Sequence, residues 1–137
     1  MVDSRITDFI KRHHVLTLAT VSVDGAPYCA ACFYAYDKGR NVLVFTSDET
    51  TRHASEMMAD SRVACAITLE TKVVGKVQGL QLCGRVRRGD DEARRCYVRR
   101  FPYAAVAPLV LWVFEPDFMK LTDNTLGFGK KLIWNRE

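Results

Sequence analysis

Short runs of β-branched and aromatic residues, separated by turn sequences, dominate the chain. The clearest run is Val42–Phe45, which follows a turn containing glycine. Such a run predicts a strand that is buried on both faces. The polar residues after it cap helices well, so we expect the strand to lead into a helix from Thr50 to Ala59, with Ser47 or Asp48 as the N-cap.

The remaining elements follow from the same periodicities. Asp24-Gly25 predicts a hairpin, and Glu115-Pro116-Asp117 is expected to separate the last two strands. The expected helices are Ser4–His14, Thr50–Ala59 and Asp91–Arg100, and the expected strands are Val15–Val23, Ala26–Tyr36, Val42–Phe45, Val63–Leu69, Val77–Val86, Leu109–Glu115 and Phe118–Thr122. Many short strands with few helices predict a mainly β fold, a β-barrel with peripheral helices, as a single domain over residues 1–137.

The segment Asn41–Ala54 is a candidate anion site. It would gather free backbone N–H groups, the hydroxyls of Thr50 and Thr51, and the guanidinium of Arg52 at the positive end of a helix. Phosphate suits such a site best. The alternative is an ordinary strand, cap and helix with a solvated arginine.

Small residues form a second candidate feature in the strand Ala26–Tyr36. Ala30, Ala31 and Cys32 precede Phe33, and small side chains let a flat ligand approach the strand backbone. The alternative, which composition alone favours, is that they fit a tight barrel interior. Gln81, in a later strand, would contact either a ligand or water.

The C-terminal tail holds a Gly-x-Gly-Lys-Lys sequence that ends near Trp134. Its spacing differs from that of a phosphate-binding P-loop, and no clear helix follows it. Flexible backbone, Lys130 and an aromatic side chain would still suit one wall of a site for an anionic aromatic ligand.

No residue qualifies clearly as a catalytic acid or base. His53 and Tyr34 are the nearest candidates, although a lone histidine in a first helical turn is more often a capping or packing residue. Cys29 and Cys32 form a C-x-x-C within a strand, where their sulfur atoms point to opposite faces, so we expect no metal or redox site.

The five cysteines and the N-terminus bear on location. An odd number of cysteines, mostly in apolar sequence, favours reduced thiols. No apolar run resembles a signal peptide or a membrane span. We therefore expect a cytoplasmic protein with no membrane partner.

The net charge of +4 is unevenly distributed, because seven of the thirteen arginines lie between Arg85 and Arg100. This patch could attract a nucleic acid. Acidic residues interrupt it and no nucleic-acid-binding motif accompanies it, so a solvated or dimer-facing surface is the favoured alternative.

With these features assembled, the chain resembles the FMN-binding split barrels of the pyridoxamine 5′-phosphate oxidase-like superfamily over nearly its whole length. The run from Pro27 through Phe45-Thr46 to Thr50-Thr51-Arg52 carries the resemblance. More narrowly, Arg99–Pro102 and Asp123–Lys131 resemble the YhbP group of small bacterial proteins, which has no assigned reaction.

The resemblance implies FMN as the cofactor and a homodimer with sites at its interface. Thr50, Thr51 and Arg52 would hold the phosphate, and Ala30, Ala31, Cys32 and Phe33 would line the isoalloxazine ring through their backbone. Thr46 would contact the ring or the ribityl chain, Gln81 would face the same site, and Trp134 would form a wall from the partner subunit.

The chain also departs from the family pattern. Ala30 replaces a strand arginine, and Thr51-Arg52 replaces an Arg-Lys pair at the phosphate. Each charge-assisted contact contributes about 1.5–3 kcal/mol, so the departures imply weak FMN binding or an apo protein on purification. We therefore expect an FMN-binding protein that acts as an oxidoreductase on an unknown small molecule. The alternative is a flavin-free split-barrel dimer that binds a small molecule or a protein.

Overall fold

The computed structural model describes all 137 residues and contains three α-helices and seven strands. The helices are α1 (Ser4–Arg12), α2 (Arg52–Ala59) and α3 (Asp91–Arg100). The strands are β1 (Val15–Val21), β2 (Pro27–Asp37), β3 (Val42–Thr46), β4 (Arg62–Leu69), β5 (Gln78–Arg88), β6 (Leu111–Asp123) and β7 (Lys131–Asn135). Three short 3₁₀ turns, η1 (Val74–Lys76), η2 (Pro102–Val106) and η3 (Asn124–Leu126), lie in the connections.

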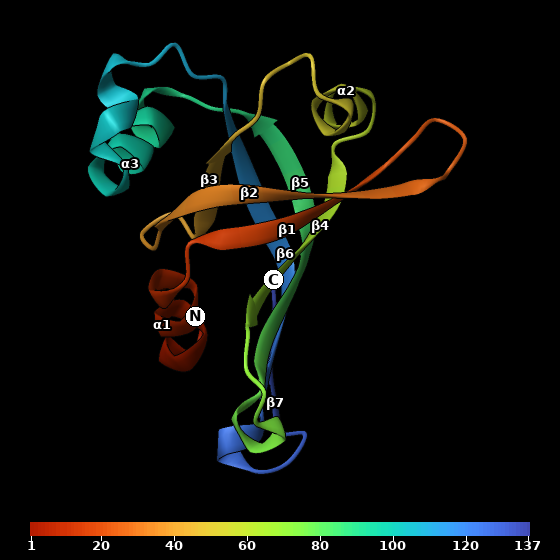
Figure 1. The fold of residues 1–137 in the computed structure, drawn as a ribbon, viewed down its shortest axis with the longest axis vertical. Helices are drawn as coiled ribbons and strands as arrows, with labels where there is room; N and C mark the ends of the chain where they lie inside the picture. The colour runs from red at the N-terminus through yellow and green to blue at the C-terminus, as the bar shows by residue number, and fades with distance from the viewer.

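Six strands close into an antiparallel barrel, as the sequence predicted. The strand order is β3-β2-β1-β4-β5-β6-β7, and a further pairing between β3 and β6 closes the barrel. The first part of β6 pairs with β3, from Thr46↔Leu111 to Leu43↔Phe114, and the last part pairs with β7. The paired ends of β5, β6 and β7 therefore project beyond the barrel, with η1 and η3 at the tip (Figure 1).

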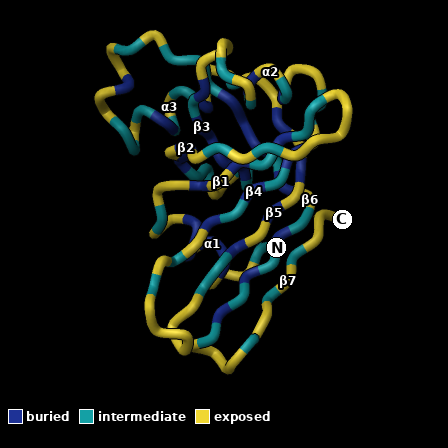
Figure 2. Tube along the Cα trace, turned by 45° about the vertical axis from the view of Figure 1, so that its right-hand side comes forward, coloured by how far each residue is buried: buried dark blue, intermediate teal, exposed yellow.

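Apolar side chains form one core inside the barrel and a second layer outside it. The inner core includes Phe45 and Phe114 and is closed at its ends by α1 and α2. Outside the barrel, α3 and η2 cover β2, β3 and β6, with Tyr97 packed on Val44 and Val113. Figure 2 shows the buried segments within the barrel strands and the exposed ones at the turns and the projecting tip.

Pro116 does not break the last strand, which corrects the sequence-based prediction. The register between β5 and β6 shifts between Cys83 and Gly84, so Gly84 pairs with Pro116, Cys83 pairs with Phe118, and Asp117 is the extra residue of a bulge. A Cβ atom at position 84 would collide with the carbonyl group of Glu115. Gly84 thus permits the close approach that keeps β6 continuous through a proline.

Two further boundaries differ from the predictions. The helix α2 begins at Arg52 rather than Thr50, because Thr51 is the N-cap and its Oγ1 accepts a hydrogen bond from the Ala54 amide at 3.2 Å. The tail, for which we predicted no strand, forms β7 on the free edge of β6.

No helix has the length and apolar character needed to cross a membrane.

Candidate functional site

The loop between β3 and α2, the predicted phosphate site, is organised around Asp48. Its Oδ1 accepts hydrogen bonds from the backbone amide and the hydroxyl of Thr50, both at 2.8 Å. The hydroxyl of Thr51 donates to the Asp48 carbonyl oxygen at 2.8 Å. The two contacts from Thr50, the amide first, lower the pKa of Asp48. A carboxylate of the chain therefore occupies donors that the resemblance assigns to phosphate.

Arg52 lies on the side of α2 that faces the β1–β2 hairpin. Its Nε donates to Glu56 Oε2 at 3.1 Å, and its Cζ lies 4.1 Å from the ring centroid of Tyr28. The Thr20 hydroxyl donates to the other oxygen of Glu56 at 2.6 Å, and this bond is the main cause of a lowered Glu56 pKa. The two Nη atoms of Arg52 have no partner within the chain. Arg52 lines a hollow of about 470 Å³ beside the hairpin.

Behind the loop, His53 and Cys32 meet at the buried side chain of Ser47. His53 Nε2 lies 2.7 Å from Ser47 Oγ, and Cys32 Sγ lies 3.9 Å from the same oxygen. The Trp112 indole donates to the Ser47 carbonyl at 3.1 Å. Burial lowers the pKa of His53 and raises that of Cys32, which favours the neutral form of both. The arrangement anchors the loop to the barrel.

Tyr34, the second candidate acid or base, lies inside the barrel. Its side chain is fully buried, and its hydroxyl donates to the Ile10 carbonyl at 2.6 Å. Burial raises its pKa well above the usual value. Its position indicates a structural role, in which it holds α1 against β2.

The residues predicted to line the isoalloxazine ring lie on two different faces of β2. Cys32 belongs to the inner core, and Ala30 lies on the same face by strand alternation. Ala31 and Phe33 are exposed on the outer face. Thr46 follows Phe45, the register partner of Tyr34, so it lies beside Phe33 on that outer face.

Three aromatic side chains form an exposed shelf next to Ala31 and Thr46. The ring centroids of Phe33 and Phe101 are 5.9 Å apart in an edge-to-face arrangement, and those of Phe101 and Tyr103 are 6.4 Å apart. Phe33 and Tyr103 are 56% and 62% exposed. We call Phe33, Phe101 and Tyr103 the aromatic shelf. No local sequence pattern indicates the part played by Phe101 and Tyr103, because they follow α3 and reach β2 only through the tertiary fold.

Gln81 lies in the same row as Ala31 on the outer face of the barrel. The register runs from Ala31 through Thr17 and Ala66 to Gln81, across β2, β1, β4 and β5. Three strand spacings place Gln81 about 14 Å from Ala31. Gln81 also borders a mainly apolar hollow of about 330 Å³ on this face, which we call the outer groove. Its other lining residues are Thr17, Ala19, Cys29, Ala64, Cys65, Ala66, Leu82, Cys83 and Phe118.

The two predicted residues of the tail lie away from the aromatic shelf. Lys130 is exposed in the turn before β7, at the projecting tip (Figure 1). Trp134 pairs with the buried Met119 and packs on the inner core, on the face opposite to Gln81. Within one chain, therefore, neither Lys130 nor Trp134 joins Thr50–Arg52.

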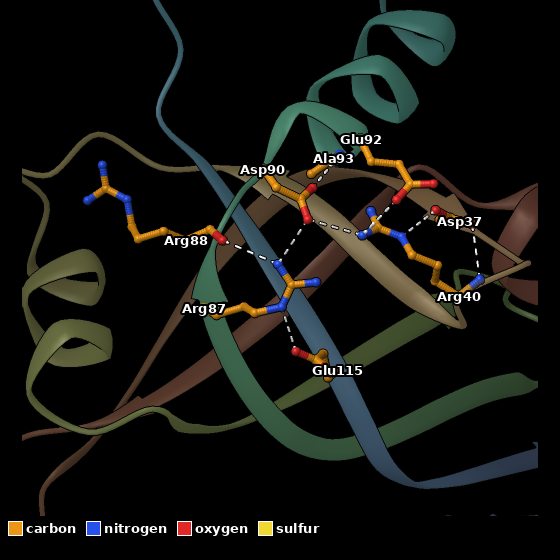
Figure 3. Close-up of polar contacts among 8 residues, drawn as sticks. All are labelled: Asp37, Arg40, Arg87, Arg88, Asp90, Glu92, Ala93 and Glu115. Atoms are coloured by element: carbon orange, nitrogen blue, oxygen red, sulfur yellow. Dashed lines mark hydrogen bonds and ion pairs between the residues drawn. The ribbon is translucent and has the colours of Figure 1, made fainter.

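Internal contacts hold most arginines of the Arg85–Arg100 patch. Figure 3 shows Arg87 between Glu115, at 2.6 Å, and Asp90, at 3.4 Å. Arg88 pairs with Glu49 at 2.8 Å. Bonds to other partners hold three more members: Arg85 to Ser61 Oγ, Arg94 to the carbonyls of Ala104 and Ala105, and Arg100 to the carbonyls of Lys11 and His13. Only Arg95 and Arg99 have no partner, so the patch is not a continuous free surface for nucleic acid.

Comparison with known proteins gives consistent matches. A family model described as pyridoxamine 5′-phosphate oxidase matches residues 2–120. A UPF0306 protein of Klebsiella pneumoniae (strain 342) is 41% identical and the UPF0306 protein YhbP of Salmonella paratyphi B is 40% identical, each over 133 residues that cover 94% of this chain and 90% of the relative.

Among solved structures, an FMN-binding protein from Nostoc punctiforme, related to pyridoxamine 5′-phosphate oxidase, has a TM-score of 0.74 at 12% identity, with 98% of this chain and 90% of that chain covered. A haem-binding protein from Mycobacterium smegmatis has a TM-score of 0.73 at 20% identity, with 89% and 52% covered. Identities this low support the fold alone.

Proposed function

Because the chain belongs to the pyridoxamine 5′-phosphate oxidase family, we propose that it binds FMN as a homodimer, on the part of the outer face of β2 and β3 around the exposed Ala31 and Phe33. The observation that carries this proposal is the aromatic shelf beside Ala31 and Thr46. A flat ring system can stack on exposed aromatic side chains while strand backbone groups bind its polar edge.

The phosphate site fits FMN in part. The Nη atoms of Arg52 are free to bind a phosphate, because its ion pair with Glu56 uses Nε. The Asp48 carboxylate, however, holds the amide and hydroxyl of Thr50, so a phosphate has to displace it to reach these donors. This competition, together with the absent second cation, supports weak FMN binding. The bound flavin would supply hydride or electron transfer through its N5 edge, and the protein would position it.

A second copy of the chain would complete the site. The outer groove is mainly apolar and contains small side chains such as Ala66, which let another surface approach closely. Lys130 and Trp134 lie too far from Thr50–Arg52 to help in their own subunit, so we assign them to the partner's site. Five free cysteines support a location in the reducing cytoplasm.

Thermal unfolding with and without FMN tests the proposal. Saturating FMN should raise the melting temperature of the wild type, as mass action requires. Arg52→Ala should bind FMN at least about tenfold more weakly while folding normally, because a lost charge-assisted contact costs about 1.5–3 kcal/mol and an exposed ion pair adds little stability. Arg62→Ala, at the start of β4, is the control. A melting temperature that saturating FMN leaves unchanged would refute FMN binding.

A flavin-free binding dimer is the second candidate, and the occupation of the loop by Asp48 favours it. The haem-binding structural neighbour suggests that this fold accepts flat ligands other than flavin. If haem raises the melting temperature and FMN does not, this second candidate replaces the first. If the dimer forms and neither haem nor FMN raises its melting temperature, a protein partner becomes the better candidate.

A further inference from the structure

Four cations that form no ion pair line a groove on the flank of the barrel. Its lining residues come from the C-terminal turn of α1, the β2–β3 turn and α3. These three elements lie along the left side of the molecule in Figure 1. The four cations are Lys11, Lys38, Arg95 and Arg99, and none of their side chains makes an ion pair or hydrogen bond within the chain. The groove consists of adjoining hollows of about 250 and 380 Å³.

One wall of this groove is held in place by Arg40. Its Nε binds Asp37 at 2.9 Å, and its Nη1 lies 3.2 Å from Asp90 and 3.3 Å from Glu92 (Figure 3). The β2–β3 turn, which carries Lys38, is thereby fixed to the start of α3. Asp37 and Glu92 are also the two acids that line the groove. Arg40 pairs with both, but its single charge offsets only part of theirs. The lining still carries four cations against two acids, so its net charge is positive.

The opposite wall is held in place by Arg100. Its Nη2 donates to the carbonyls of Lys11 and His13, at 3.3 and 2.5 Å, which ties the end of α1 to the end of α3. Lys11 and Arg99 therefore lie across a groove whose two sides cannot separate without breaking these bonds. Cations on fixed walls lose less conformational entropy when they bind a ligand.

Helix dipoles explain only half of this arrangement. Lys11 and Arg99 lie in the last turns of α1 and α3, where positive charge is favourable. Lys38 lies in a turn and Arg95 in the middle of a helix, so a helix dipole does not explain a positive charge at either position. Arg95 and Arg99 are four residues apart and share one helical face, where like charges repel.

We propose that this groove binds a small, multiply charged anion, the phosphate groups of a phosphorylated metabolite. Phosphate oxygens would meet the guanidinium groups of Arg95 and Arg99 from one side and the ammonium groups of Lys11 and Lys38 from the other. The groove shares no residue with the proposed FMN site. A nucleic-acid backbone fits less well, because the neighbouring arginines Arg87, Arg88 and Arg94 are engaged within the chain.

Calorimetric titration with pyrophosphate tests this site. The wild type should bind one pyrophosphate per chain, and Arg95→Gln/Arg99→Gln should weaken binding at least about tenfold, because two charge-assisted contacts are lost. Lys72→Gln/Lys76→Gln removes the same charge near η1 and should bind nearly as the wild type does. No binding by the wild type, or equal weakening in both double variants, would overturn the proposal.

A second measurement locates the ligand without any substitution. Cys96 lines both hollows and is half-buried. Pyrophosphate should slow alkylation of Cys96, followed by peptide mass spectrometry, whereas sodium chloride at the same ionic strength should not. Unprotected Cys96 would place the anion elsewhere.

Competition separates this site from the alternatives. FMN and pyrophosphate should bind independently, so failure of FMN binding would leave this proposal standing. If FMN displaces pyrophosphate, or pyrophosphate displaces FMN, the two ligands share one site and the proposal of a separate anion site is refuted. Displacement of pyrophosphate by a low concentration of a short single-stranded oligonucleotide would identify a nucleic-acid surface instead.

Discussion

At the scale of single residues, Asp48 has the strongest influence on the proposed phosphate site. It caps its own loop through Thr50 and carries a negative charge where the cofactor would place another. The same side chain thus stabilises the loop and opposes the ligand.

Asp48→Asn should increase FMN affinity. The amide oxygen of asparagine can still accept the Thr50 hydrogen bonds, so the loop should keep its shape, while the repulsion between carboxylate and phosphate disappears. We expect about tenfold tighter binding, a difference of about 1.4 kcal/mol, measured by flavin fluorescence. Asp8→Asn, on the exposed side of α1, is the control for net charge. Unchanged or weaker FMN binding by Asp48→Asn would mean that Asp48 does not occupy the phosphate position.

At the scale of elements, the start of α3 links helix capping to the ion-pair network of Figure 3. Asp90 is the N-cap, and its Oδ1 accepts the Ala93 amide at 2.8 Å. This bond, followed by the contact with Arg40, lowers the pKa of Asp90 to about 2. The network positions the helix and the β2–β3 turn together.

The lowered pKa predicts a pH-dependent role for Asp90. A carboxyl group with a depressed pKa in the folded state stabilises the fold above its unfolded pKa of about 4, and this contribution is lost as the pH falls toward about 2. Asp90→Asn still caps the helix but lacks the charge. Its melting temperature should be lower than that of the wild type at pH 7. The difference between the two melting temperatures should decrease from pH 4 to pH 2. A difference that stays constant over this range would show that the charge contributes nothing.

Gly84 permits the continuous strand β6, so its substitution should be costly. Gly84→Ala should destabilise the protein by about 2 kcal/mol or more, because the added methyl group overlaps the backbone at Glu115 and Pro116. Gly75→Ala is the matched control, since its methyl group would meet nothing within 4 Å. Urea unfolding of both variants gives the comparison. Equal stability would mean that the bulge adapts.

The barrel, most strand positions and the bounds of α3 were predictable from the sequence, because alternation and capping are local signals. The continuity of β6 was not, since the residue that accommodates Pro116 is Gly84, on another strand. The Thr50–Arg52 loop was also indicated by local sequence. The contact between Asp48 and Thr50 is equally local, because the two residues are only two positions apart. The aromatic shelf required the tertiary fold, which brings Phe101 to Phe33. No sequence pattern could show that Arg40 pairs with Asp37 and Glu92.

At the scale of the whole molecule, the proposed dimer predicts a specific sensitivity at the outer groove. Ala66→Arg places a long charged side chain on this small-residue face and should shift the protein from dimer to monomer in analytical ultracentrifugation, with loss of FMN binding. Val23→Arg, in the exposed β1–β2 turn, should leave both unchanged. A dimer that survives Ala66→Arg would place the interface elsewhere.

The pairing of β3 with β6 also has a kinetic consequence. It joins segments that are distant along the chain, and such contacts form late in folding. Ser47, which starts the candidate loop, is itself attached to the far segment through the Val110 carbonyl and the Trp112 indole. The loop can therefore take its final shape only after the barrel has closed. A cofactor that binds this loop would therefore bind only the folded barrel. It should lower the unfolding rate and leave the folding rate unchanged.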